Sequence, residues 1–213
     1  MYIHVKRLLD FVLSMLALVV LSPLLLVLAV VIRATSPGPV FFRQKRVGQA
    51  KRHFMIYKFR TMRTDAPKDQ PTHLLKDPNA YITPVGRFLR RSSLDELPQL
   101  LNIIKGEMAV VGPRPALWNQ FDLIAERDKY GANDLRPGLT GWAQINGRDE
   151  LPIEVKARLD GEYVRRMSFG FDARCILGTV FKVLRSEGVV EGARAEEAGN
   201  MQTQRDKTDA GSR

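Results

Sequence analysis

The sequence predicts an α+β protein that is mostly helical and carries a membrane segment at its N-terminus. Residues 11–32 form an uncharged apolar run of 22 residues, and about 20 apolar helical residues span a bilayer core. Apolar residues recur at helical spacing in most later segments. Only two short segments near residue 50 have the composition of strands, which indicates a small β-hairpin.

The apolar run is interrupted by Pro23, which follows Ser22. It is too long for the apolar core of a cleavable secretory signal. Proline removes a helical hydrogen bond and kinks a helix, and a nearby hydroxyl can satisfy the freed carbonyl. Basic residues flank both ends, which favours the cytoplasm for both. The residues alone leave open a kinked spanning helix and a re-entrant helix that returns to the face it entered.

Three segments are expected: a membrane helix at 1–34, a membrane-associated domain at 35–186 and a disordered tail at 187–213. Short strands are predicted at Val40–Phe42 and Phe54–Phe59. Amphipathic spacing predicts helices at Thr83–Arg91, Leu94–Ile104, Trp118–Lys129, Ile153–Met167 and Ala173–Leu184. The apolar stripe of the last helix suits either a protein core or a membrane interface. Asp65–Asp77 and Arg136–Gly147 are predicted as loops.

Charge and cysteine content limit the chemistry. The formal net charge is +10, so an anionic partner is expected: nucleic acid, anionic lipid or a phosphorylated substrate. A single cysteine, Cys175, excludes an internal disulfide, and with three scattered histidines it makes no zinc-type cluster. Any metal would be bound by oxygen, which points to magnesium.

Asp95 and Glu96 are adjacent acids where a helix is expected to begin. Ser93 through Glu96 fits a capping box, with Ser93 as the cap, and helix capping alone would explain both acids. The alternative is a reaction centre, because Arg90 precedes the pair and Arg114 follows in a Gly-Pro-Arg-Pro turn. Arginine grips phosphate oxygens at two points, and a carboxylate can attack phosphorus.

Further cations extend this pattern. Arg148 closes the Gly-rich loop, and Lys58 and Arg60 lie in the predicted hairpin region. Each of these charges also suits a solvated surface or attraction to anionic headgroups. No Walker-type phosphate loop is present, so ATP hydrolysis is unsupported.

Six motifs in order resemble the bacterial sugar transferase family, the small monotopic phosphoglycosyl transferases, over residues 3–186. They are Ser36-Pro-Gly-Pro-Val-Phe-Phe-Arg-Gln44, Lys58-Phe-Arg-Thr-Met62, Ser93-Leu-Asp-Glu-Leu-Pro-Gln-Leu100, Gly106-Glu-Met108, Val111-Gly-Pro-Arg-Pro115 and Pro137-Gly-Leu-Thr-Gly-Trp-Ala-Gln-Ile-Asn-Gly-Arg148.

This resemblance implies a re-entrant membrane helix broken at Ser22–Pro23 and a catalytic pair at Asp95 and Glu96. It implies that Asp95 attacks a UDP-sugar and expels UMP, and that undecaprenyl phosphate then accepts the sugar-phosphate from Asp95. Mg²⁺ is expected beside Asp95. Arg90 and Arg114 match phosphate-handling positions, and Arg148, Lys58 and Arg60 are expected to join them.

The same resemblance places the chain at the cytoplasmic face of the bacterial inner membrane, without a nucleic-acid partner. It leaves the sugar, the glycan pathway and the oligomeric state open. Two rival functions are also compatible with the residues. A basic membrane-anchored protein that binds nucleic acid or scaffolds an assembly would explain the charge. An ordinary glycosyltransferase would move the sugar without its phosphate and release UDP.

Overall fold

The computed structural model describes residues 2–67, 75, 77–147 and 151–184. The predicted tail at 187–213, Arg148 and part of the predicted loop at Asp65–Asp77 lie outside these residues. Within them, helices predominate and two small sheets are present. The predicted fold class, α+β and mostly helical, is therefore confirmed.

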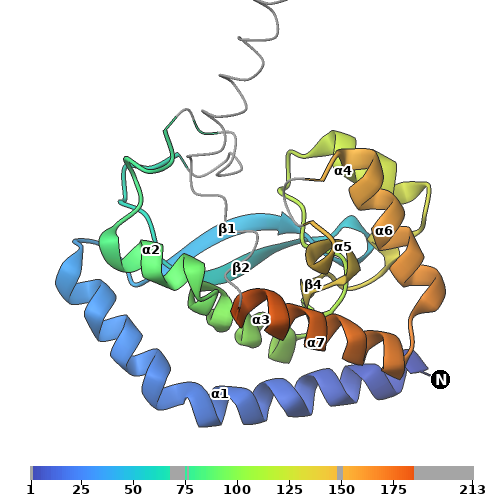
Figure 1. Ribbon diagram of the computed structural model, residues 1–213, viewed down its shortest axis with the longest axis horizontal. Coiled ribbons are helices and arrows are strands. Elements are labelled where there is room, and N and C mark those ends of the chain that lie inside the picture. Colours follow the sequence, from blue (N-terminus) through green and yellow to red (C-terminus); the bar gives the residue numbers. More distant parts are fainter. Residues whose placement is uncertain (1, 68–74, 76, 148–150, 185–213) are drawn as a thin grey trace, which may run out of the picture.

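Helix α1 (Tyr2–Thr35) runs beneath the rest of the molecule and is bent near its middle (Figure 1). Pro23 lies inside it, and the Ser22 hydroxyl donates to the carbonyl of Val19 at 2.7 Å. The expected break at Ser22–Pro23 is thus a bend within one continuous helix. A bend suffices because the neighbouring turns remain hydrogen-bonded around the proline.

The polarity of α1 is reversed relative to a helix of a soluble protein. Its buried side includes Lys6, Asp10 and Ser14, spaced four residues apart, whereas Leu16, Val20 and Leu26 are exposed. Polar residues in membrane segments face protein, and apolar residues face lipid. Among the described residues, α1 is the one helix long and apolar enough to cross a membrane.

Both ends of α1 are attached to the same body. At its start, the Tyr2 hydroxyl and the Lys6 ammonium each donate to Asp172 Oδ2 at 2.7 Å. Just beyond its end, Arg60 donates to the Ser36 carbonyl at 2.7 Å. A helix of 34 residues is about 50 Å long, and its bend lets both ends meet one surface (Figure 1).

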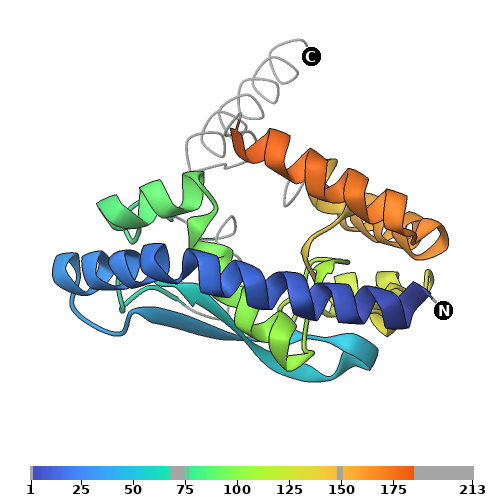
Figure 2. The same ribbon diagram turned by 90° about the horizontal axis from the view of Figure 1, so that it is seen from below.

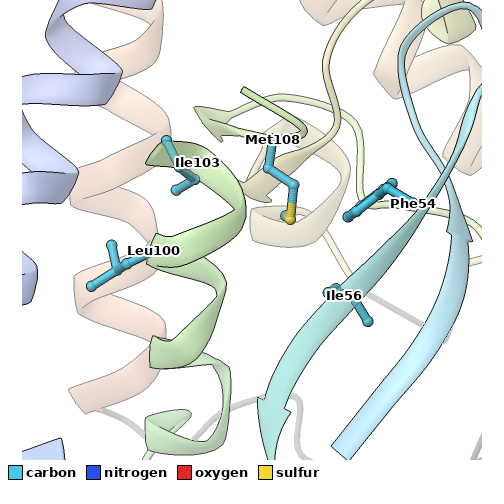
Figure 3. Close-up of a cluster of buried hydrophobic side chains, with 5 residues drawn as sticks. All are labelled: Phe54, Ile56, Leu100, Ile103 and Met108. Carbon is cyan, nitrogen blue, oxygen red and sulfur yellow. The ribbon is translucent and has the colours of Figure 1, made fainter. Parts of the chain in front are cut away.

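The hairpin pairs β1 (Phe41–Val47) with β2 (His53–Phe59) in antiparallel register, with Phe41 opposite Phe59. It is longer than predicted, because β1 includes the basic residues before the turn. The short 3-10 helix η1 (Gln49–Lys51) forms that turn. Phe54 and Ile56 of β2 pack against Leu100, Ile103 and Met108 to form one core (Figure 3).

The central segment contains α2 (Pro84–Arg91), the 3-10 helix η3 (Leu94–Gln99) and α3 (Leu100–Lys105). The sequence predicted one helix over Leu94–Ile104, but Pro98 lacks the N–H that a regular α-helix would use there. The first turns are therefore 3-10, and the α-helix begins at Leu100. Thr83 caps α2 by accepting from the Gly86 amide at 2.9 Å.

A second, parallel sheet pairs β3 (Ala109–Val111) with β4 (Gly138–Thr140). The predicted loop at Arg136–Gly147 therefore contains β4 and also α5 (Trp142–Ile145). At Gly138 a Cβ would lie 2.1 Å from the Gly112 amide nitrogen. Glycine lets the Gly-Pro-Arg-Pro turn and the Gly-rich segment lie backbone to backbone.

The C-terminal half adds α4 (Phe121–Asp128), the 3-10 helix η4 (Ala132–Asp134), α6 (Ile153–Arg166) and α7 (Phe169–Leu184). Phe171 and Cys175 of α7 are buried against Tyr163 and Val111. The predicted apolar stripe faces away from this core, because Leu177, Val180 and Phe181 are exposed. This arrangement favours a membrane interface over core packing for the stripe.

Candidate active site

Asp95 and Glu96 lie in η3, immediately after a reversal of the chain. Ser93 has a left-handed backbone, with φ of 55°, and its side chain makes no capping hydrogen bond. The predicted capping box is therefore wrong. Both acids lie in the first turn of η3, and the Asp95 side chain is buried. Capping does not account for Glu96, because its carboxylate binds side chains instead of the Ser93 amide.

Glu96 accepts hydrogen bonds from two cations that come from different parts of the chain. Lys58 Nζ of β2 donates to Glu96 Oε1 at 2.7 Å, and Arg114 NH2 donates to the same oxygen at 3.0 Å. The Glu96 side chain is 12% exposed. Burial by itself would raise the pKa of Glu96, but Arg114 and Lys58 hold that pKa well below its usual range. Glu96 is thus an ionised carboxylate at neutral pH.

The environment of Asp95 is different. Burial raises the pKa of the Asp95 carboxyl to about 6, and the negative charge of Glu96 adds to the increase, while Lys58, Arg90 and Arg114 oppose it. Among the described residues, no hydrogen bond reaches the Asp95 carboxylate. An ionised carboxylate without hydrogen-bond donors keeps its lone pairs available for attack on phosphorus or for a metal ion.

Lys58 is also affected by burial, which lowers the pKa of its ammonium while Glu96 raises it. Arg90 of α2 is held by Thr61, to which its Nε donates at 2.9 Å. The structure thus brings together four of the predicted residues, through hydrogen bonds or charge: Asp95, Glu96, Lys58 and Arg114. The charge of Arg90 also acts on Asp95.

Arg60 is placed differently from the prediction. Its terminal nitrogens donate to the backbone carbonyls of Pro37 and Ser36, and the side chain is buried. These bonds tie the end of β2 to the turn that follows α1. Arg60 follows the last residue of β2, so strand geometry does not hold its side chain on the same face as Lys58. Arg148, the remaining predicted phosphate ligand, lies outside the described residues.

The sequence reasoning missed residues that hold the site together. Arg127 of α4 donates to the Arg114 carbonyl at 2.9 Å and forms a buried ion pair with Asp160 of α6. Asn102 of α3 accepts from the Tyr57 amide at 3.0 Å and donates to the Met55 carbonyl at 2.8 Å. No local pattern marks these residues, because their partners are distant in the sequence.

The motifs that the structure assembles identify the family. The model of the bacterial sugar transferase family matches residues 1–186. This chain belongs to the bacterial sugar transferase family. Its enzymatic class is thereby established, and the non-enzymatic alternative is wrong.

This sugar transferase is similar in sequence to several bacterial proteins. It is 44% identical over 184 residues to an uncharacterized sugar transferase of Bacillus subtilis, EpsL, covering 86% of this chain and 89% of the relative. It is 41% identical over 190 residues to the UDP-glucose:undecaprenyl-phosphate glucose-1-phosphate transferase of Xanthomonas campestris pv. campestris, covering 86% of this chain.

A third relative, of Aeromonas hydrophila, is named UDP-N-acetylgalactosamine-undecaprenyl-phosphate N-acetylgalactosaminephosphotransferase. It is 35% identical over 193 residues, covering 88% of this chain. The chain spans 39% and 45% of the two relatives with named substrates. Because these two names specify different sugars, the likeness does not identify the sugar that this transferase uses.

Proposed function

We propose that this sugar transferase moves a sugar 1-phosphate from a UDP-sugar to undecaprenyl phosphate and releases UMP. This reaction would be the first membrane step of bacterial polysaccharide or glycoconjugate biosynthesis. The observation that carries the proposal is the contrast between two adjacent acids. Glu96 is bonded to Lys58 and Arg114, whereas the described residues donate no hydrogen bond to Asp95.

In the first half-reaction, a carboxylate oxygen of Asp95 bonds to the β-phosphorus of the UDP-sugar. The bond from that phosphorus to the bridging oxygen breaks, and the oxygen leaves on UMP. In the second, an oxygen of the lipid phosphate bonds to the same phosphorus and the Asp95 carboxylate is released. Such a covalent intermediate predicts ping-pong kinetics.

Lys58, Arg90 and Arg114 provide the positive charge that phosphoryl transfer requires. Glu96 keeps two of these cations in place before substrate arrives, because it bonds to both through one oxygen. Glu96 is therefore proposed as a positioning carboxylate, and Asp95 as the nucleophile.

The residues present fit a magnesium ion at Asp95. Mg²⁺ is usually held by one or two carboxylates together with substrate phosphates and water, and the described residues leave the Asp95 carboxylate open. No cluster of three or more potential protein ligands occurs among the described residues, so the substrate would supply further oxygens. When bound, Mg²⁺ would neutralise charge on the transferring phosphate.

A membrane location follows from α1. Its exposed side is apolar, and both of its ends are bonded to one body. A helix that crossed the bilayer completely would place its ends on opposite faces. We therefore favour a re-entrant helix, with the catalytic body at the cytoplasmic face of the inner membrane.

The released nucleotide tests the reaction. Purified enzyme with a UDP-sugar, Mg²⁺ and undecaprenyl phosphate is expected to release UMP, whereas an ordinary glycosyltransferase would release UDP. Sugar-phosphate labelled with ³²P at the β-position should remain on the wild-type protein when acceptor is omitted, and Asp95→Asn should abolish this labelling. Release of UDP, or full labelling of Asp95→Asn, would refute the proposal.

A further inference from the structure

A cavity of about 240 Å³ lies directly beside the reaction centre. Glu96 and Ser93 form part of its wall, so it is continuous with the site that contains Asp95. The opposite wall belongs to α7. In both views α2 and α7 lie on the same side of α1 (Figures 1 and 2). The cavity thus separates the reaction centre from the helix that exposes an apolar stripe.

The walls of this cavity are mainly aliphatic. They include Leu97, Val110, Ile145, Ile176, Val180 and Val183. Several polar groups in the wall are already paired within the protein: the hydroxyls of Thr140 and Thr179 bond to each other, and Gln144 Nε2 donates to the Leu139 carbonyl at 3.0 Å.

These walls suit a flexible hydrocarbon better than a nucleobase. None of the described residues that line the cavity is aromatic, whereas bases are commonly held by stacking on aromatic rings. Contact between the aliphatic wall and a branched hydrocarbon chain removes apolar surface from water, and the favourable free energy is proportional to the area removed.

The cavity is continuous with the exposed apolar face of α7. Ile176 and Val180 line the cavity and are also 37% and 50% exposed. Leu177 and Phe181 extend this face on the same helix. A lipid could therefore pass from the exposed apolar face of α7 into the cavity while staying in contact with apolar side chains.

Positive charge is placed where the headgroup of such a lipid would sit. Arg91 and Lys182 line the cavity together with the aliphatic residues. A phosphate near them would be attracted electrostatically, and its chain would extend along α7. The combination matches an amphiphile with one anionic end and a branched hydrocarbon tail.

We propose that this cavity binds the isoprene units of the polyprenyl phosphate acceptor that are nearest its phosphate, with α7 as the outer wall. This assignment rests on the proposed function and adds the residues that recognise the acceptor lipid. The volume accommodates only the first part of a long polyprenyl chain, so the remainder would leave along Ile176 and Val180 to the membrane.

The test separates the two half-reactions of the full-length enzyme in nanodiscs. Val183→Phe narrows the cavity, and we expect it to raise the KM for undecaprenyl phosphate by about tenfold or more, since even a one-methylene misfit in an apolar pocket costs about tenfold. Release of UMP in the absence of acceptor should be unchanged, as should the KM for the UDP-sugar. Leu177→Phe is the matched control, because Leu177 is exposed and does not line this cavity.

A second variant guards against misfolding of the first. Val183→Ala enlarges the cavity. It should raise the acceptor KM severalfold and leave the release of UMP in the absence of acceptor unchanged. Unchanged acceptor KM in both folded variants would overturn the assignment, and so would an increase confined to the UDP-sugar KM, which would place the donor in the cavity. If the wild-type enzyme released no UMP without acceptor, the covalent mechanism itself would fail, whatever the cavity binds.

Discussion

Arg127 and Asp160 form an ion pair that is almost completely buried, with Arg127 NH2 2.6 Å from Asp160 Oδ2. The same guanidinium donates through NH1 to the carbonyl of Arg114 at 2.9 Å. The pair therefore links α4 and α6 to the turn that presents Arg114 to Glu96. Through these contacts, Arg127 and Asp160 hold the turn that contains Arg114.

Replacing Asp160 with asparagine should destabilise the protein strongly. Removing one partner of a buried ion pair leaves an uncompensated charge and typically costs about 3–5 kcal/mol. Chemical denaturation of Asp160→Asn measures this loss. Lys51→Ala breaks the exposed pair with Asp128 and should change stability by less than about 1 kcal/mol. Equal effects of the two substitutions would argue against a structural role for the buried pair.

Glu96→Gln keeps the shape of the side chain but removes the charge that Lys58 and Arg114 bind. We expect kcat to fall on the order of 10²-fold, as when a group that organises charge stabilisation is lost. Steady-state UMP release provides the measurement. Glu126→Gln is the control, since Glu126 pairs with exposed Lys129. If Glu96→Gln kept the wild-type kcat, the charge of Glu96 would not be required to position Lys58 and Arg114.

The pH dependence of the first half-reaction should report Asp95. Burial raises the pKa of this carboxyl to about 6, and only the ionised form can attack phosphorus. The rate of UMP release without acceptor should therefore increase with pH, reach half of its maximum near the pKa, and level off about one pH unit above it. A single-turnover profile between pH 5 and pH 8 tests this. A rate independent of pH over that range would be inconsistent with Asp95 as a nucleophile of raised pKa.

Asp95→Asn should gain stability relative to wild type as the pH rises. The native carboxyl binds its proton more tightly than the unfolded one, whose ordinary pKa is 3.8. Wild type therefore loses stability as pH rises from about 4 to 6, and asparagine cannot ionise. Melting temperatures at pH 5 and pH 8 should show the larger advantage of the variant at pH 8. A larger advantage at pH 5 would contradict the raised pKa.

Cysteine labelling tests the re-entrant course of α1. His4→Cys and Lys45→Cys, each in a Cys175→Ser background, introduce thiols at exposed positions before and after the apolar run at residues 11–32. Both should react with an impermeant maleimide in inside-out vesicles and be protected in intact spheroplasts. Reaction of the two thiols from opposite sides of the membrane would establish a spanning helix.

Much of the local structure was predictable because it depends on neighbouring residues. Thr83 and Pro84 begin α2 where the sequence indicates, and α6 begins at Ile153 as predicted. The helix over Leu94–Ile104 was only partly correct, since Pro98 imposes 3-10 geometry before Leu100. The pairing of β3 with β4 was missed because three-residue strands carry too little pattern to be recognised.

The candidate site shows the same division. The sequence alone identified Asp95, Glu96, Lys58, Arg90 and Arg114 as candidates, because motif order and residue chemistry are properties of the chain. Only the tertiary structure decided how these side chains are arranged. It binds Lys58 and Arg114 to Glu96, leaves Asp95 open among the described residues, and turns Arg60 toward the backbone of Ser36 and Pro37. Hydrogen bonding and burial depend on which distant segments pack together, and that information is absent from any local stretch of residues.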